Sequence, residues 1–151
     1  NVTLSFLKNF IRHGIIQSRK EASIVREQVK ALNIKVANVS QTINSLSGGN
    51  QQKVVLAKWM ITAPKIIIFD EPTRGIDVGA KVEIYRIMCE YVAQGNAIIL
   101  VSSEMPEAMG MSDRIIVLSN HQYSGELKRE EFSEEAIAQL QFKHMVKSLK
   151  N

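Results

Sequence analysis

A short apolar run that ends in two acidic residues is the feature that most constrains the fold of this chain. Residues 66–69 are apolar, and Asp70 and Glu71 follow them directly. A run of this length without polar alternation is typical of a strand buried on both faces. Residues 79–93 then place their apolar side chains on one helical face, and residues 97–101 form a second apolar run. Strand, helix and strand predict one parallel crossover unit in an α/β fold.

The elements around this unit follow from similar patterns. The helix over residues 79–93 is expected to bury Ile84, Ile87, Met88 and Tyr91 and to stop at Gly95. Downstream we predict a short helix near residues 105–111, a third strand over residues 114–118, a tight turn at Asn120 and His121, and an antiparallel return over residues 122–127. A last helix is predicted to start at Ser133 and to carry Ile137, Leu140 and Met145.

The first 45 residues differ from the rest in the spacing of their apolar residues. Their apolar residues recur at helical spacing, which predicts a small helical region: Leu4, Leu7, Phe10, Ile11, Val25, Val29 and Leu32. Residues 1–60 also hold nine lysines and arginines against two glutamates. An anionic neighbour such as nucleic acid or lipid headgroups is one interpretation, but no aromatic residues are interleaved with the basic ones. The pattern favours a plain solvated face.

Several residue types exclude other functions. The single cysteine, Cys89, cannot form an internal disulfide and lies on the apolar side of its helical pattern, which fits a buried thiol in a reducing compartment. No metal-like spacing relates His13, His121 and His144. Trp59 lies among aliphatic residues and is interpreted as core. The longest apolar stretch is far below the roughly 20 residues of a membrane span, and the start at Asn1 lacks a secretory signal, so we expect a fragment.

Two short motifs carry candidate chemistry. In the first, Ser47, Gly48 and Gly49 precede an amphipathic run, so backbone N–H groups, a helix dipole and a hydroxyl could together bind a phosphate. The alternative for this triplet alone is an ordinary serine-capped helix after a turn. In the second, Asp70 could hold Mg²⁺ through water and Glu71 could polarise an attacking water. The alternative for that pair alone is two acids at the surface end of a strand.

The combination of the two motifs is more specific than either. The glycine motif lies about twenty residues before the acidic pair, with one helix between them. In this order the chain resembles the ABC ATPase family. Residues 46–53 look like its signature motif, residues 66–70 like Walker B, Glu71 like the catalytic glutamate, residues 74–77 like the D-loop and residues 101–104 like the switch region.

The individual residues of these motifs resemble one subfamily: the second nucleotide-binding half of double-cassette ATPases that drive ribose, galactose and xylose importers. This resemblance implies an α/β, P-loop NTPase-like core without its N-terminal strands and phosphate loop. Residues 1–45 would be the end of the helical subdomain, residues 46–127 the signature helix and core, and residues 128–151 a C-terminal helical extension. The implied site comprises Glu71 as the catalytic residue, Asp70 for Mg²⁺, and an ATP-binding set of Leu46, Ser47, Gly48, Gly49, Gln51, Asp70, Asp77 and Ser103.

The resemblance also implies an activity and partners. It implies an ATPase on the cytoplasmic face of the membrane that couples ATP and Mg²⁺ to sugar uptake. The partners would be another ABC half or second ATPase chain, permease subunits and, indirectly, a sugar-binding protein, with no nucleic acid. A nucleoside importer ATPase and an ABC ATPase acting on nucleic acid or the ribosome are the alternatives. A catalytically silent partner-binding module is a third.

Two departures from the family pattern bear on catalysis. No G-x-x-x-x-G-K-[ST] loop occurs in the sequence, so we expect the isolated chain to be inactive. Ser103 also stands where the family's switch histidine is expected. In such cassettes each ATP lies between the Walker motifs of one half and the signature of the other. Ser47 would therefore serve the partner half's site, while Asp70 and Glu71 would serve a weaker site of their own.

Overall fold

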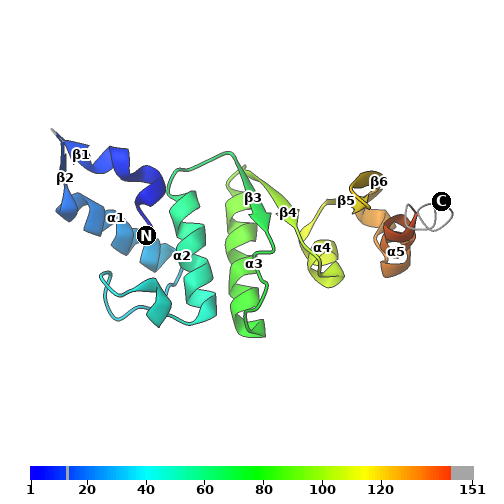
Figure 1. Ribbon diagram of the computed structural model, residues 1–151, viewed down its shortest axis with the longest axis horizontal. Coiled ribbons are helices and arrows are strands. Elements are labelled where there is room, and N and C mark those ends of the chain that lie inside the picture. The colour runs from blue at the N-terminus through cyan, green and yellow to red at the C-terminus, as the bar shows by residue number, and fades with distance from the viewer. Residues whose placement is uncertain (13, 144–151) are drawn as a thin grey trace. The chain divides into compact units, whose positions relative to one another are not determined.

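The computed structural model describes residues 1–12 and 14–143, and the chain forms two compact units, Asn1–Ile99 and Leu100–Asn151 (Figure 1). The boundary falls within strand β4. The elements of the first unit are, in order, η1 (Leu4–Phe10), β1 (Ile11–Arg12), β2 (Ile15–Ile16), α1 (Ser18–Ala31), η2 (Ile43–Ser45), α2 (Gly48–Met60), β3 (Ile66–Asp70), α3 (Val78–Ala93) and β4 (Ala97–Val101).

The N-terminal region is mainly helical, as predicted, but contains a hairpin that the helical spacing did not predict. Strands β1 and β2 pair antiparallel, with Ile11 opposite Ile16 and Arg12 opposite Ile15. Gly14 has a φ of 79° within this turn, a backbone conformation that glycine adopts at little cost. Of the apolar residues at this spacing, Phe10 and Leu32 are buried, whereas Leu4 and Ile11 are 60% and 44% exposed.

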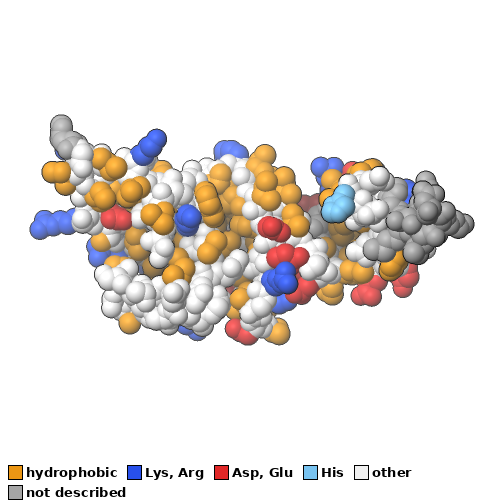
Figure 2. All heavy atoms as spheres, in the orientation of Figure 1, with side chains coloured by type: hydrophobic (Ala, Val, Ile, Leu, Met, Phe, Trp, Pro, Cys, Tyr) orange, Lys and Arg blue, Asp and Glu red, His pale blue; other side chains and the backbone are white. Residues whose placement is uncertain are grey.

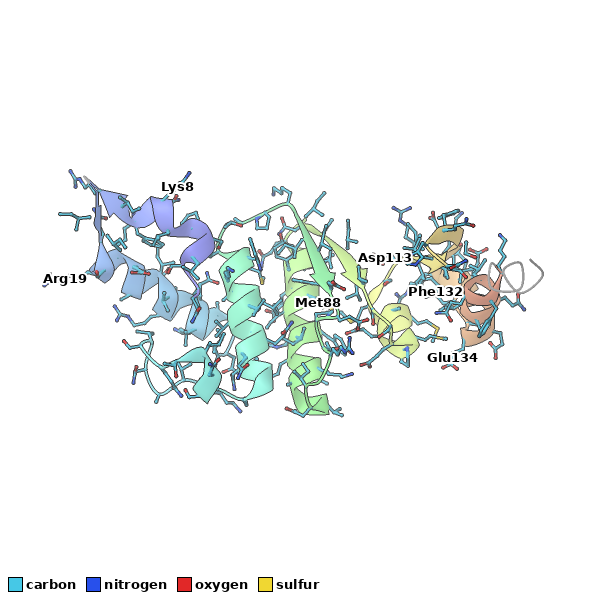
Figure 3. All side chains as sticks on the ribbon, in the orientation of Figure 1. Lys8, Arg19, Met88, Asp113, Phe132 and Glu134 are labelled. Carbon is cyan, nitrogen blue, oxygen red and sulfur yellow. The ribbon has the colours of Figure 1, made fainter. Side chains whose placement is uncertain are left out.

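Helix α2 packs against α3, α1 and η1, and with them it forms the core of the first unit. The predicted apolar face of α3 is confirmed, since Ile84, Ile87, Met88 and Tyr91 are all buried (Met88 is labelled in Figure 3). Gly95, with a φ of 81°, follows the helix end as expected. The Tyr91 hydroxyl donates a hydrogen bond to the carbonyl of Pro64, which ties the end of α3 to the segment before β3.

Two expectations about buried residues are wrong. Cys89 is exposed, because it lies on the side of α3 opposite Ile87 and Met88. Trp59 is 50% exposed near the end of α2, where the Lys58 ammonium lies 4.9 Å from the centre of its ring. In each case the neighbouring residues of the helix are apolar, which suggested burial. Other elements cover only one face of that helix, however, and the residue lies on another face.

Strands β3 and β4 form a two-stranded sheet joined through α3. The Ala97 N–H donates to the Lys65 carbonyl at 2.9 Å, so both strands start at the same end and run parallel, as predicted (Figure 1). The expectation that β3 is buried on both faces is wrong. Ile67 and Phe69 are buried, whereas Ile66 and Ile68 are 60% and 66% exposed. Successive strand residues point to opposite faces, and only one face of β3 is covered among the described residues.

The second unit contains α4 (Met105–Met111), β5 (Arg114–Ser119), β6 (Gln122–Lys128), η3 (Arg129–Glu131) and α5 (Glu134–Phe142). Strands β5 and β6 form an antiparallel hairpin whose turn is the predicted pair Asn120 and His121, both with positive φ. Ile115, Val117 and Ile137 form the core, and partly buried side chains such as Phe132 pack against it (Phe132 is labelled in Figure 3).

The start of the last helix is also confirmed. The Ser133 hydroxyl accepts the N–H of Ala136 at 3.1 Å, which caps α5. Of the apolar residues predicted for this helix, Ile137 is buried, and Met145 lies outside the described residues. Within residues 1–12 and 14–143, no helix combines the length and the apolar character that a membrane span requires.

Charge is unevenly distributed in the first unit. Lys8, Arg12, Arg19 and Lys20 are exposed on η1, β1 and α1, and Figure 2 shows basic side chains over these N-terminal elements. Lys8 and Arg19 are labelled in Figure 3, where their side chains extend outward from the ribbon. These basic side chains are exposed in the described chain, which agrees with a solvated face and with an anionic neighbour alike.

Candidate functional site

The glycine motif forms the start of α2. Ser47 is the N-cap residue with extended backbone angles and is exposed, and Gly48, Gly49 and Asn50 are the first three helical residues. The simple interpretation, a serine cap, does not describe this helix, because the Ser47 side chain accepts no capping hydrogen bond from the backbone. Its Oγ accepts instead from the Asn50 Nδ2 at 2.8 Å. The amides of the first turn are therefore not satisfied by the Ser47 hydroxyl.

The two glycines differ in what requires them. A Cβ on Gly49 would lie 2.5 Å from the Cβ of Ala80 in α3, closer than real carbon atoms approach. A Cβ on Gly48 would meet only the Ile76 Cγ2, at an ordinary 3.7 Å. Gly49 is thus needed for close packing of α2 on α3, while internal packing leaves room for a side chain at Gly48.

Asp77, predicted to belong to the D-loop, is the N-cap of α3. Its Oδ1 accepts the Ala80 N–H at 2.9 Å. Ser47 and Asp77 face one polar pocket of about 240 Å³ between the starts of the two helices, lined by Lys35, Ser47, Gly49, Asn50, Lys53, Asp77, Gly79, Ala80 and Glu83. The structure therefore brings the predicted signature motif and the predicted D-loop together, although they are about thirty residues apart in the sequence.

A buried lysine holds this pocket together. Lys53 is only 2% exposed, and its Nζ forms an ion pair with Glu83 of α3 and donates to the Asn33 carbonyl at 2.8 Å. A buried ammonium is costly unless it is paired and hydrogen-bonded, and Lys53 meets both conditions. The hydrogen bond from Lys53 lowers the pKa of Glu83 below its usual value. Lys53 thereby links the first turns of α2 to α3 and to the end of α1.

Asp70 and Glu71 lie at the carboxyl end of β3, where open α/β sheets commonly place ligands. Asp70 is exposed, and Glu71 has a φ of 48°, an uncommon conformation for a residue other than glycine. The Arg74 N–H donates to the Glu71 carbonyl at 3.2 Å, and Pro72 and Thr73 beneath this turn are buried. The buried turn holds the Glu71 backbone in a conformation that costs energy, a pattern that clusters at functional sites.

A magnesium ion would fit Asp70 only with help from a nucleotide. Among the described residues no group of three or more His, Cys, Asp or Glu side chains could hold a metal. Mg²⁺ commonly uses one or two carboxylates and takes its other ligands from water and phosphate. One exposed carboxylate at the end of β3 meets that requirement.

The remaining predicted site residues are placed separately. Leu46 lies at the end of η2, and its carbonyl accepts from the Gln51 Nε2 at 2.9 Å, so both residues shape the entry to α2. Ser103 belongs to the second unit and is exposed, and the neighbouring Ser102 Oγ accepts the Glu104 N–H at 3.1 Å. Asp70 and Glu71 do not line the pocket at Ser47.

Six lining residues of the pocket were not among the predicted site residues: Lys35, Asn50, Lys53, Gly79, Ala80 and Glu83. A signal was present for Asn50, because the third residue of a helix often reaches back to a serine N-cap. A signal for Lys53 was weaker. It follows Gly49 by four residues and therefore lies on the same helical face, but a lysine on that face is normally expected to reach solvent.

The fold and the site together define a class. A parallel strand, helix and strand unit whose first strand ends in a carboxylate pair, with a glycine-rich helix start beside the N-cap of its helix, is typical of a nucleotide-binding α/β protein. The family model described as ABC transporter matches residues 2–74. Residues 2–74 therefore match the ABC transporter family, and the chain is similar to the ATP-binding proteins of ABC importers.

Its relatives include sugar import ATPases. The chain is 50% identical over 141 residues to the ribose import ATP-binding protein RbsA of Clostridium perfringens, covering 93% of this chain and 28% of the relative. It is 47% identical to the xylose import ATP-binding protein XylG of Photobacterium profundum, covering 91% of this chain and 27% of the relative. The chain thus spans between a quarter and a third of the length of these relatives.

Solved structures support the fold alone. A metal-chelate type ABC transporter in an inward-facing conformation matches with a TM-score of 0.78 at 15% identity, covering 94% of this chain and 56% of that one. The ATP-binding cassette MJ0796, in a dimeric post-hydrolysis state with ADP and Pi, matches with a TM-score of 0.68 at 24% identity, covering 85% of this chain and 56% of that one.

Proposed function

We propose that this chain works as part of the second nucleotide-binding half of a sugar import ATPase, where it contributes to ATP binding and hydrolysis. The observation that carries the proposal is the pocket that joins Ser47 and Gly49 to Asp77, because it places a hydroxyl, first-turn amides and a helix dipole at one surface. An anionic phosphate from a neighbouring half is the ligand that such a surface suits.

Under this proposal the residues have distinct roles. Ser47, Gly48 and Gly49 contact the γ-phosphate of the ATP held by the partner half, and Asp77 holds the adjoining helix start in place. Asp70 holds Mg²⁺ through water, and Glu71 orients the attacking water at this half's own site. Leu46 and Gln51 shape the signature turn, and Ser103 stands in the switch region after β4.

The uncovered face of β3 supports the proposed place within a longer protein. Ile66 and Ile68 are both more than half exposed, and a pair of adjacent isoleucines on a sheet is normally covered by further strands or helices. The relatives named above are three to four times longer than this chain. We propose that other parts of such an ATPase cover this face and supply the phosphate loop.

The proposed partners and location follow from the same role. The neighbours are a second cassette half, permease subunits on the cytoplasmic face of the membrane and, indirectly, a sugar-binding protein. The exposed basic residues of η1, β1 and α1 suit a position facing the permease. The residues before β3, rather than Asp70 and Glu71, would then couple ATP binding to the membrane subunits.

Steady-state hydrolysis by the full-length ATPase tests the proposal. We expect Ser47→Arg to abolish turnover, because a bulky cation replaces a small hydroxyl at the surface that must close on the phosphate. Gln139→Arg is the control for an added cation, since Gln139 is exposed on α5, outside the candidate site and the elements proposed to face the permease. Normal turnover by Ser47→Arg would refute the proposed role of the signature motif.

A further inference from the structure

The side-chain amide of Asn50 links two parts of the candidate site. Its Oδ1 accepts the backbone N–H of Lys35 at 2.8 Å, and its Nδ2 donates to the Ser47 Oγ at 2.8 Å. A backbone N–H can only donate, so the atom facing Lys35 must be the amide oxygen. This contact determines the orientation of the amide, and the Asn50 amino group therefore faces Ser47.

The orientation of Asn50 has a consequence for the Ser47 hydroxyl. A serine hydroxyl has one proton to donate and two lone pairs to accept. Because the Ser47 Oγ accepts from Asn50, its own proton cannot point along that contact. Ser47 is exposed, and among the described residues its hydroxyl donates no hydrogen bond, so the proton is available to a ligand.

We propose that Asn50 is a positioning residue that holds Ser47 as a hydrogen-bond donor toward the phosphate. This inference rests on the proposed function of Ser47. Asn50 acts through Ser47 and the Lys35 segment and is not itself a catalytic residue. Its partly buried place in the first turn of α2 makes the arrangement part of the folded framework rather than an induced contact.

The chemistry of the asparagine side chain is specific to this task. Aspartate would still accept from the Lys35 N–H but would also accept the Ser47 proton, turning the hydroxyl away from the phosphate and adding a negative charge beside it. Leucine, which is also branched at Cγ, would remove both contacts. Glutamine would keep both chemical groups on a side chain one methylene longer.

A double-mutant cycle in the full-length ATPase tests the inference, with kcat/KM for ATP as the readout. We expect Ser47→Ala to lower kcat/KM roughly ten- to hundredfold, the loss of one hydrogen bond to a charged group. Asn50→Leu should also lower it. The Ser47→Ala, Asn50→Leu double variant should match Ser47→Ala alone, because Asn50 acts through a hydroxyl that is already absent.

The outcomes separate this inference from the proposed function. Suppose that Ser47→Ala lowers kcat/KM, and that the decrease in the double variant is the product of the two single decreases. Asn50 then has another role, and this inference fails while the proposed role of Ser47 stands. If Ser47→Ala turns over normally, the proposed role of Ser47 fails and the inference falls with it. A merely structural Asn50 would give multiplied losses, because its loss would displace more than the hydroxyl.

Asn50→Asp guards against misfolding of the leucine variant, since it keeps the acceptor for the Lys35 N–H. We expect its kcat/KM to fall at least tenfold with its thermal unfolding midpoint close to that of the wild type. Asn38→Asp is the control for added charge, because Asn38 lies in the exposed loop before α2 and its Oδ1 already accepts the Ser40 N–H. Equal effects of the two aspartate variants would overturn the inference.

Discussion

At the scale of single residues, the Lys53 and Glu83 pair gives a pH-dependent prediction. Lys53 lowers the pKa of Glu83 in the folded chain. A lowered carboxyl pKa stabilises the fold above the unfolded value, 4.5, and this contribution is lost as the pH falls through the folded pKa. We expect Glu83→Gln to cost about 1 kcal/mol near neutral pH, discounted because the Glu83 side chain is 35% exposed.

Denaturant unfolding from pH 7 down to pH 3 measures that difference. The gap between the wild type and Glu83→Gln should shrink below about pH 4.5, where Glu83 becomes protonated in the unfolded and then in the folded chain. Glu90→Gln is the matched control on the same helix, because Glu90 and its partner Arg86 are both 52% exposed. A pair that exposed is worth no more than about 0.5 kcal/mol, and a larger cost would argue against burial as the cause.

The glycines of the signature motif give a second prediction at this scale. Gly49→Ala should lower the free energy of unfolding by about 1–3 kcal/mol, because its Cβ would overlap the Cβ of Ala80. In an Ala80→Gly background the same change should cost much less. Gly48→Ala is the control and should not destabilise the chain by overlap, since its Cβ would have only an ordinary contact. Equal losses at the two glycines would contradict the packing account.

These residues also show how far the sequence could go. The resemblance of residues 46–53 and 66–77 to known motifs predicted the ABC ATPase family, and three of the predicted site residues, Ser47, Gly49 and Asp77, line one pocket. The contacts that hold the site together could not be predicted, because they depend on which faces of α2 and α3 meet. Lys53 illustrates this limit, since only the positions of Asn33 and Glu83 show that a lysine can be buried there.

At the scale of secondary structure elements, periodic patterns predicted the elements but not what covers them. The helix α3 and the strands β3, β4, β5 and β6 occur where apolar patterns placed them. The hairpin of β1 and β2 was missed, because two-residue strands are too short to show an alternation. The one-sided burial of β3 could not be predicted either. An apolar run shows that both faces of a strand are suited to burial, but it does not show whether other elements cover both of them.

The turn between β5 and β6 gives a prediction at this scale. Asn120 and His121 have φ values of 48° and 59°, the positive pair that a two-residue hairpin turn of type I′ requires. His121→Gly should raise the free energy of unfolding by about 0.5–1 kcal/mol, because glycine adopts this conformation without steric cost. Thermal unfolding of the chain measures the effect. His121→Ala is the control and should bring no gain, since alanine has the same Cβ conflict as histidine.

At the scale of the whole molecule, the asymmetry between two motifs leads to the last prediction. The Ser47 motif is complete and opens on a polar pocket with Asp77, whereas the chain has serine at position 103 where a switch histidine is expected. If each nucleotide lies between the signature of one half and the Walker motifs of the other, Ser47 serves a site of the partner half. Asp70 and Glu71 then serve a site that lacks one of its groups.

In the full-length ATPase we therefore expect Glu71→Gln to lower kcat several-fold at most. Loss of a general base at a working site costs roughly a hundredfold or more, but this substitution removes a water-orienting carboxylate only from the weaker of two sites. Ser47→Arg should abolish turnover, because it obstructs the site where the partner half carries out hydrolysis. Steady-state ATPase assays on the two variants decide the matter. Should Glu71→Gln prove as inactive as Ser47→Arg, this half is itself a working catalytic site, and Ser103 does not impair it.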